Sequence, residues 1–399
     1  MEACCPAPDR SGLVQPPSGN CSQRATSLAP PPWHLLCGVP NGTEDAWHHR
    51  PMDAWPYPTL LADVGGTNIR FAIAEQAHAL PAHVRVLSTK DHAGLAEAAQ
   101  AYLAAIGRHL PGSSGGLRRP ASAACAVATP VAAARRGPVR LTNTDFTIDG
   151  AGLLEHLGLQ ALWLANDFEA LAWSLPTLDA GEIQVIGTVA PTMDATMAVI
   201  GPGTGMGCAG LLRHASGWLA IPGEGGHVTL SGRTGFEREV LAAAAEQIDH
   251  VSAEKLISGV GMPLLYRAVA TVRGLEAARL PLPTPREITS RAVAGEDAFC
   301  AEVVATFCGL LGGYAGNVAL TYGATGGVLI GGGIATHIAD LLVRSEFRSR
   351  FEDKGRFRSY LAAIGTARIT VEQPALEGLV HALGTALPSL PVQRPTAAG

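Results

Sequence analysis

Three short stretches of this chain combine glycine with apolar flanks. They are DVGGTN at 63–68, GPGTGMG at 201–207 and GGVLIGGG at 326–333. Glycine lets the backbone approach a ligand closely and direct its N–H groups at phosphate oxygens. A single stretch of this kind also fits an ordinary tight turn, but three of them beside apolar runs favour a nucleotide-binding protein.

Two common nucleotide-binding motifs do not explain these stretches. The P-loop pattern GxxxxGK[ST] does not occur. Residues 205–210 match GxGxxG, and Glu224 follows about 20 residues later, where a Rossmann fold places its ribose-binding acid. However, residues 209–212 continue as an apolar, strand-like run instead of opening a long helix. We therefore interpret this segment as a hairpin turn and disfavour the dehydrogenase hypothesis.

Asp63 ends an apolar run directly before Gly65 and Gly66. Its carboxylate would face any phosphate held in that turn, and two anions need a cation between them. Mg²⁺ fits, because proteins usually hold it through water and one or two carboxylates together with substrate phosphates. The alternative is an aspartate that only accepts hydrogen bonds from its own turn.

Further polar residues occupy expected turns and helix starts. Asn166 and Asp167 follow the apolar run LWLA and precede an expected helix, so Asp167 could cap that helix or accept a proton from a substrate hydroxyl. Glu224 and His227 lie in PGEGGH, and Glu254 lies in HVSAEKLISG. A lone histidine is more often structural than a ligand. As a set, however, these residues suit a polyhydroxylated ligand, because each carboxylate can accept from adjacent hydroxyls.

The composition favours a globular protein with a small-molecule partner. The 399 residues are 47% hydrophobic and 16% charged, which predicts a sizeable core and two domains or one large composite one. The net charge of -5 provides no cationic field for nucleic acid or a membrane. The eight cysteines lack CxxC or zinc-ligand spacing, so no structural metal site is expected. No apolar run approaches the roughly 20 residues of a membrane span, and no signal peptide is evident, which predicts a cytoplasmic protein.

The elements that must position these residues alternate between strands and helices from Thr59 onward. Strands are expected at 60–64, 69–73, 121–128, 162–165, 197–200 and 328–330, and helices at 93–109, 168–175, 236–250 and within 298–320. The first two strands flank a glycine turn and predict a β-hairpin. The alternation predicts an α/β chain in two lobes, and the recurring glycine turns suggest two related halves. Residues 1–58 are proline-rich and are interpreted as a disordered extension or a mis-assigned start.

Eight motifs, in order along the chain, resemble those of bacterial glucokinases, which belong to the hexokinase, actin and Hsp70-like ATPase superfamily. They are LADVGGTNIRFA, TNTDF, ANDFEA, GPGTGMG, PGEGGHV, HVSAEKLISG, GGVLIGGGI and FEDKGRF, between about Thr59 and Leu387. The resemblance implies an α/β, two-lobed actin/hexokinase-like ATPase fold with mixed sheets flanked by helices. It places the small lobe at 59–175, with 368–387 returning to it, the large lobe at 176–367 and a flexible tail at 388–399.

The resemblance also implies an activity: phosphoryl transfer from MgATP to the 6-hydroxyl of glucose, giving glucose 6-phosphate and ADP at the entry to glycolysis. The implied catalytic base is Asp167, and Mg²⁺ would lie on Asp63, through water. The glucose-binding residues would be Asn166, Asp167, Glu224, His227 and Glu254, with Asn143 at the edge of the pocket. The residues that would bind ATP are Ala62, Asp63, Val64, Gly65, Gly66 and Thr67 in a first phosphate loop, Gly203, Thr204 and Gly205 in a second, and Gly331, Gly332 and Gly333 beside the adenosine. Further implications are a cytoplasmic location and a homodimer. The net charge, in turn, predicts no nucleic-acid or membrane partner.

Two departures from the family pattern are the N-terminal extension and Phe146, where the family often has tryptophan. Neither falls on an implied catalytic position. A different class of function is a non-catalytic sugar sensor that kept the fold. The presence of both Asp63 and Asp167, and the lack of a DNA-binding segment, speak against a sensor.

Overall fold

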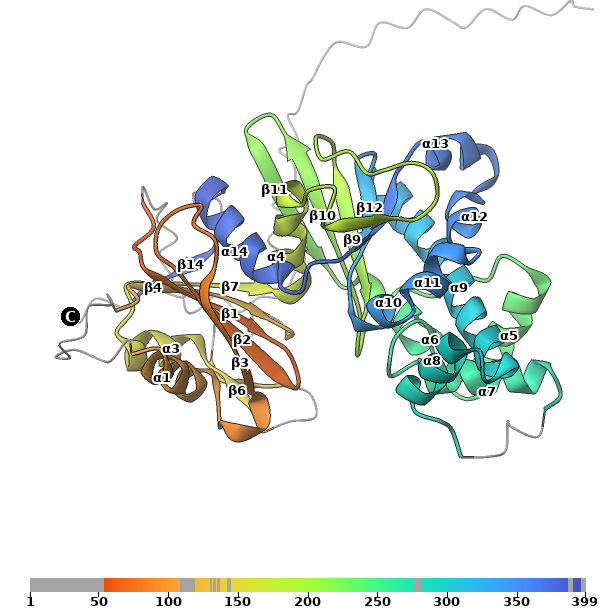
Figure 1. Ribbon diagram of the computed structural model, residues 1–399, viewed down its shortest axis with the longest axis horizontal. Helices are drawn as coiled ribbons and strands as arrows, with labels where there is room; N and C mark the ends of the chain where they lie inside the picture. Colours follow the sequence, from red (N-terminus) through yellow and green to blue (C-terminus); the bar gives the residue numbers. More distant parts are fainter. Residues whose placement is uncertain are drawn as a thin grey trace, which may run out of the picture. The chain divides into compact units, whose positions relative to one another are not determined.

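The computed structural model describes residues 54–107, 119–129, 131, 134, 137–141, 145–275, 281–386 and 390–395. These residues form two six-stranded mixed sheets, together with a small two-stranded sheet of β5 (Val139–Arg140) and β6 (Thr147–Ile148). Figure 1 shows the helices that flank the two large sheets. The expectation of a mixed α/β fold is confirmed. Most of the proline-rich segment, residues 1–53, lies outside the described residues.

The first sheet has the strand order β14-β7-β4-β1-β2-β3. Its strands are β1 (Thr59–Val64), β2 (Asn68–Ala74), β3 (Ala82–Ser88), β4 (Ser122–Val127), β7 (Ala161–Asn166) and β14 (Val392–Gln393). The predicted hairpin is confirmed, because β1 and β2 pair antiparallel around the turn at 65–67. Strands β1, β4 and β7 are parallel, and Val64 aligns with Val127, which aligns with Asn166. Asp63 and Asn166 therefore lie at the same edge of the sheet.

Both faces of the first sheet are covered, which explains why β1, β4 and β7 are continuous apolar runs. Leu60 packs in a cluster with residues of α1 (Leu95–Ala105) and α3 (Gly150–Leu157). Leu61 points to the opposite face, into a cluster with residues of α4 (Asp167–Ser174) and α14 (Pro374–Thr385). Because side chains alternate along a strand, Asp63 shares the face of Leu61 and thus lies on the side of α4.

The second sheet repeats the strand plan of the first. Its order is β11-β10-β9-β12-β13-β8, with β8 (Ile183–Val185), β9 (Met197–Pro202), β10 (Met206–His214), β11 (Gly217–Gly223), β12 (Gly327–Ile330) and β13 (Thr366–Ile369). Each sheet has three consecutive antiparallel strands, then two strands parallel to the first of these, then an antiparallel edge strand. This agrees with two related halves. Helix α4 contacts strands of both sheets.

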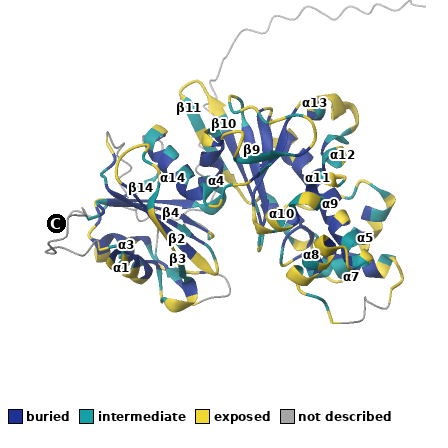
Figure 2. Ribbon diagram, viewed as in Figure 1, coloured by how far each residue is buried: buried dark blue, intermediate teal, exposed yellow. Residues whose placement is uncertain are grey.

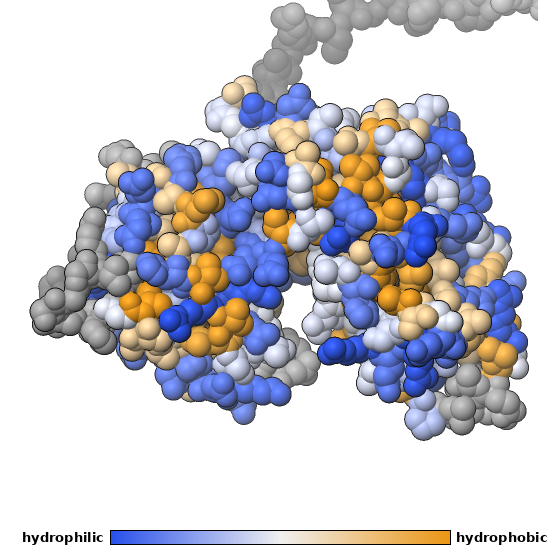
Figure 3. All heavy atoms as spheres, in the orientation of Figure 1, coloured by the Kyte–Doolittle hydropathy of each residue, from blue (hydrophilic) through white to orange (hydrophobic). Residues whose placement is uncertain are grey.

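The remaining helices belong to the second half of the protein, which is built around the second sheet. They are α5 (Gly235–Ala245), α6 (Ala253–Leu256), α7 (Met262–Val272), α8 (Pro285–Ala294), α9 (Ala298–Tyr322), α10 (Gly333–His337), α11 (Ala339–Arg344), α12 (Phe347–Glu352) and α13 (Arg358–Ala362). Single 3₁₀ turns occur at Thr89–Asp91, Leu175–Thr177, Gly225–His227 and Gly355–Phe357. Figure 2 shows the central strands of both sheets buried, while the exposed residues gather on loops, on outer helix faces and on the edge strands β3 and β11. On the face shown in Figure 3, hydrophilic and hydrophobic residues are interspersed.

Helix α9 is the core helix of the second half. With 25 residues, the helix is long and apolar enough to cross a membrane, by length and composition only. The prediction that no apolar run approaches the length of a membrane span is therefore wrong. Most of the helix is buried against other elements of the protein, which accounts for its composition. Its glycines allow close packing: a Cβ on Gly316 would lie 2.5 Å from the carbonyl oxygen of Phe351 in α12.

Three predicted boundaries differ from the structure. Trp55, only 6% exposed, donates its indole N–H to Thr59 Oγ1 at 2.7 Å, so packed structure begins before Thr59. Arg368 lies in β13 of the second sheet, and the chain reaches the first sheet only at α14 and β14. Within the predicted tail, Val392 and Gln393 pair with β7. A two-residue strand is too short to show periodicity, so the sequence could not reveal it.

The contact between α9 and α12 gives a test of the core. A Cβ on Gly312 would overlap the carbonyl oxygen of Phe347, whereas one on the neighbouring Gly313 meets nothing within 4 Å. Gly312→Ala should lower the free energy of unfolding by about 1–3 kcal/mol through overpacking. Gly313→Ala is the matched control and should be neutral or stabilising by up to about 1 kcal/mol, because alanine is the better helix former. Urea denaturation measures both, and equal effects would contradict the packing described.

Candidate active site

The candidate base lies where β7 ends and α4 begins. Asn166, the residue before the helix, is the cap: its Oδ1 accepts from the backbone N–H of Phe168 at 2.9 Å and of Glu169 at 3.4 Å. The Glu169 carboxylate accepts in return from Asn166 N at 3.3 Å, which completes a capping box. Asp167 is the first helical residue, and its Oδ1 accepts from Phe168 N at 3.0 Å. Since Asn166 caps the helix, the Asp167 carboxylate is available to a ligand.

Two other carboxylates, those of Asp63 and Glu224, act on Asp167 from separate elements. Burial raises the pKa of Asp167 to about 6, the N–H of Phe168 opposes that rise, and the charges of Asp63 and Glu224 add to it. Asp63 comes from the end of β1, and Glu224 lies between β11 and the turn at Gly225–His227. The structure thus brings together three of the predicted site residues that are far apart in sequence.

Asp63 is held by a partner that the sequence did not single out. Arg70 lies directly opposite it in the β1–β2 register, and Arg70 Nη1 is 3.3 Å from Asp63 Oδ2. Burial raises the pKa of Asp63, and the Arg70 charge lowers it. The antiparallel pairing predicted around the 65–68 turn was sufficient to place residue 70 opposite residue 63, so the signal was present.

The first glycine turn is fixed through its carbonyl groups. Gly65 N donates to Asn68 O at 3.0 Å, Thr89 Oγ1 donates to Gly66 O at 3.0 Å, and Thr89 N donates to Thr67 O at 3.0 Å. Gly66 and Thr67 are exposed, so their N–H groups can face a ligand. Ala62 and Val64 are fully buried in β1, and they anchor the strand that leads into the turn.

The second glycine turn connects β9 to β10, which confirms that the GxGxxG match is a hairpin. Gly203 N donates to Gly205 O at 3.0 Å across the turn. The turn is also tied to the chain after α6, because Gly259 N donates to Gly203 O at 2.8 Å and Val260 N donates to Thr204 O at 3.0 Å. These bonds hold its backbone in one conformation.

Glu254 lies against this second turn. Its Oε2 accepts from Met206 N at 3.0 Å, and a Cβ on Gly205 would lie 2.5 Å from the same oxygen. Two other predicted sugar-binding side chains are open to solvent: His227 and Glu224 are 60% and 77% exposed, with His227 Nε2 and Glu224 Oε2 3.9 Å apart. Asn143 lies outside the described residues.

The third glycine turn leads from β12 into α10. Gly331 N donates to Ile200 O at 2.8 Å, which ties this turn to β9. Gly332 has φ +89°, and a Cβ there would lie 2.6 Å from Pro202 O, so glycine is required on both counts. Gly333 is exposed at the start of α10. The second and third turns therefore follow neighbouring parallel strands, at the edge where α/β sheets bind ligands.

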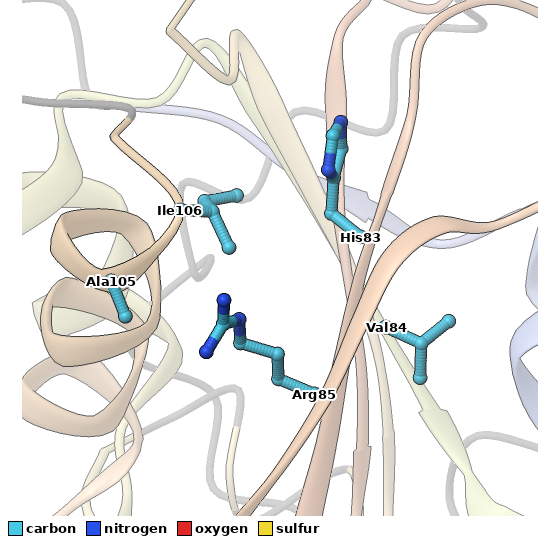
Figure 4. A pocket seen from close by; sticks show the side chains of 5 residues that line it. All are labelled: His83, Val84, Arg85, Ala105 and Ile106. Atoms are coloured by element: carbon cyan, nitrogen blue, oxygen red, sulfur yellow. The ribbon is translucent and has the colours of Figure 1, made fainter.

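A separate hollow lies between β3 and α1. His83, Val84, Arg85, Ala105 and Ile106 line it, and Figure 4 shows Arg85 extending toward α1 while Val84 points to the other side of the strand. It contains none of the predicted site residues.

Two sheets of the same plan, with glycine turns at their carboxyl edges and an acid at the start of α4, define an actin/hexokinase-like ATPase fold. The family model for glucokinase matches residues 60–386. A glucokinase of Aromatoleum aromaticum is 45% identical over 331 residues, covering 83% of this chain and 96% of that protein. One of Chromobacterium violaceum is 43% identical and covers 82% and 89%. The chain belongs to the glucokinase family.

Solved structures agree with this assignment. A crystal structure of glucokinase from an Antarctic psychrotroph superposes with a TM-score of 0.71 at 32% identity, covering 82% of this chain and 98% of that one. A ROK family glucokinase from Streptomyces griseus, solved with glucose and AMPPNP, has a TM-score of 0.51 at 17% identity, covering 81% and 98%. This second likeness concerns the fold alone.

The raised pKa of Asp167 predicts a pH-dependent cost in stability. Its pKa of about 6 in the folded protein exceeds the usual 3.8, so ionisation of this carboxyl group lowers the free energy of unfolding. The loss is complete above about pH 6 and absent below about pH 4. Asp167→Asn removes the charge but keeps an oxygen for the Phe168 N–H. Thermal unfolding of the ligand-free protein should therefore show a higher Tm for Asp167→Asn at pH 8 and a smaller difference at pH 4. A constant difference across this range would contradict the assigned pKa.

Proposed function

We propose that the chain transfers the γ-phosphoryl group of ATP to the 6-hydroxyl of D-glucose, with Asp167 as general base. Its family supports glucose and ATP as substrates. The observation that carries the proposal is the Asp167 carboxylate, which is partly buried at the start of α4 and has its pKa raised to about 6.

Such a pKa suits a base. At neutral pH the Asp167 carboxylate is largely ionised, yet it is more basic than an ordinary aspartate, and general bases work best with a pKa near the operating pH. Asp167 accepts or orients the proton of the hydroxyl as its oxygen attacks the γ-phosphate in line.

The glucose hydroxyls would bind to several side chains that differ in the hydrogen bonds they can donate or accept. Asn166 uses Oδ1 for the helix cap, so its amide N–H₂ is the group left to donate to the sugar. Glu224 and His227 present exposed side chains. Glu254 holds the second turn through Oε2, which leaves Oε1 for a hydroxyl. Asn143 is proposed for the edge of the pocket.

The phosphates would bind along the glycine turns, with Gly66 and Thr67 on one side and Gly203 to Gly205 on the other, and the adenosine would lie beside Gly331 to Gly333. Asp63 fits Mg²⁺: its ion pair uses Oδ2, and a cation would relieve the repulsion that Asp167 experiences from Asp63 and Glu224. The described residues hold no cluster of three or more His, Cys, Asp or Glu suited to a metal, so water and phosphates would complete the coordination. When bound, Mg²⁺ neutralises charge on the transferred phosphoryl group.

The two sheets, each with its helices, would be the two lobes of the enzyme. Their closure over bound substrates would exclude water, which competes with glucose as a nucleophile. The homodimer and the cytoplasmic location that the resemblance implies stay predictions, and light scattering of the purified protein tests the first of them.

The base assignment predicts a kinetic defect without unfolding. Asp167→Ala should lose roughly 10²-fold or more in kcat, the size expected for a general base. In the wild type, kcat/KM should fall as the pH drops below about 6, because protonated Asp167 cannot accept a proton. A coupled ADP-release assay with glucose measures both. Near-normal turnover of Asp167→Ala would exclude this base, and glucose binding by the wild type without turnover would favour a sensor.

The sugar assignment of Glu254 predicts a selective effect on affinity. Glu254→Gln keeps an oxygen for Met206 N but weakens acceptance from a glucose hydroxyl, so KM for glucose should rise about tenfold, and much more than KM for ATP. Glu239→Gln, an exposed change on α5, is the matched control and should alter neither constant. Equal increases in both constants would indicate that Glu254 acts only by holding the second turn.

A further inference from the structure

The residue after the candidate base packs into the second sheet. A Cβ on Gly207 would overlap Cδ2 and Cε2 of the Phe168 ring, and a Cβ on Gly201 would lie 2.5 Å from its Cζ. Gly201 and Gly207 are direct cross-strand partners in β9 and β10. The ring therefore fills a slot that exists because neither partner has a side chain, and this pair is called the glycine slot below.

The glycine slot borders the second glycine turn. Gly201 precedes and Gly207 follows the turn residues Gly203 to Gly205 in GPGTGMG, so the ring and the turn share one hairpin. Ring atoms in contact with both strands fix where α4 stands relative to that turn.

A second residue of α4 contacts the third glycine turn in the same way. Leu171 Cδ2 lies 3.1 Å from the position of a Cβ on Gly331. Residues three apart in a helix lie on the same face, so Phe168 and Leu171 present one face of α4 to both glycine turns of the second sheet. Asp167 opens this helix, and its Oδ1 accepts from Phe168 N at 3.0 Å.

We propose that Phe168 is a positioning residue: its ring, seated in the glycine slot, sets the separation between the Asp167 carboxylate and the phosphate-holding turn Gly203 to Gly205. The inference rests on the proposed function, because it uses the roles given there to the base and the turn. A displacement of about 1 Å between reacting groups can cost 10²-fold in rate. A ring that spans the gap between base and turn is therefore a determinant of kcat and not of substrate affinity.

The first test replaces the ring while keeping an apolar side chain. Phe168→Leu should lower kcat about tenfold or more, with KM for glucose and for ATP within about threefold of wild type. The control is Trp173→Leu on the same helix, whose buried ring faces His381 of α14, at 6.3 Å between ring centroids. This control should lower Tm but leave kcat of the folded enzyme within about twofold. Trp173→Phe replaces it if the leucine variant does not fold.

The second test fills the glycine slot from the other side. Gly207→Ala should displace the ring and lower kcat to a similar extent. If the ring and the slot act as one contact, adding Phe168→Leu to Gly207→Ala should cost little more, so the two losses will not add. Fully additive losses would show that the two residues act independently and would overturn the proposal.

Two further outcomes would also overturn it. One is a folded Phe168→Leu enzyme with kcat within about twofold of wild type. The other is an equal loss of kcat in Phe168→Leu and Trp173→Leu when the two variants have the same Tm. Asp167→Asn, assayed in parallel, separates the proposals. If Asp167→Asn turns over normally, the proposed base is wrong and the positioning role fails with it. If Asp167→Asn is inactive while Phe168→Leu is normal, only the positioning role fails.

Discussion

The site depends on keeping two desolvated carboxylates, those of Asp63 and Asp167, within reach of each other's charge and of the exposed Glu224. Asp63, Asp167 and Glu224 come from different elements, and the charges of the other two raise the pKa of Asp167. Repulsion of this kind is unfavourable for folding, so the scaffold must enforce it. The parallel register of β1, β4 and β7 places Asp63 and Asn166 at one edge, and the capping box fixes the start of α4. The same repulsion makes the site a favourable place for a divalent cation carried by phosphates.

The sequence predicted the local parts of this arrangement well. The turn in DVGGTN, the strand before Asn166 and the helix after it are each encoded within a few residues, as apolar runs and a diglycine. The GxGxxG match was resolved correctly because the apolar run after it continues as β10. Short-range patterns of this type carry their own physical cause and need no tertiary contacts.

The missing parts are contacts between segments far apart in the chain. Glu254 supports a turn 48 residues away through Met206 N, and no spacing rule links the two. The Phe168 ring is the reason that positions 201 and 207 must be glycine, and periodicity could not reveal this contact. The pairing of Asp63 with Arg70 could have been predicted from the sequence, since the register of the β1–β2 hairpin determines it. The role of Asn166 as the cap required the hydrogen-bond geometry itself.

The repeated strand plan has an evolutionary consequence. In the first half β7 leads into α4, and in the second half the equivalent β13 leads into α14, so α4 and α14 are counterparts. They pack so closely that a Cβ on Gly378 of α14 would overlap the carbonyl oxygen of Ala170 in α4. Of these two helices, only α4 begins with an acid: the segment before α14 reads VEQ, and the first helical residue is Pro374. An ancestral duplication would thus have given two copies of one strand-helix unit, of which a single copy carries an aspartate at the start of its helix.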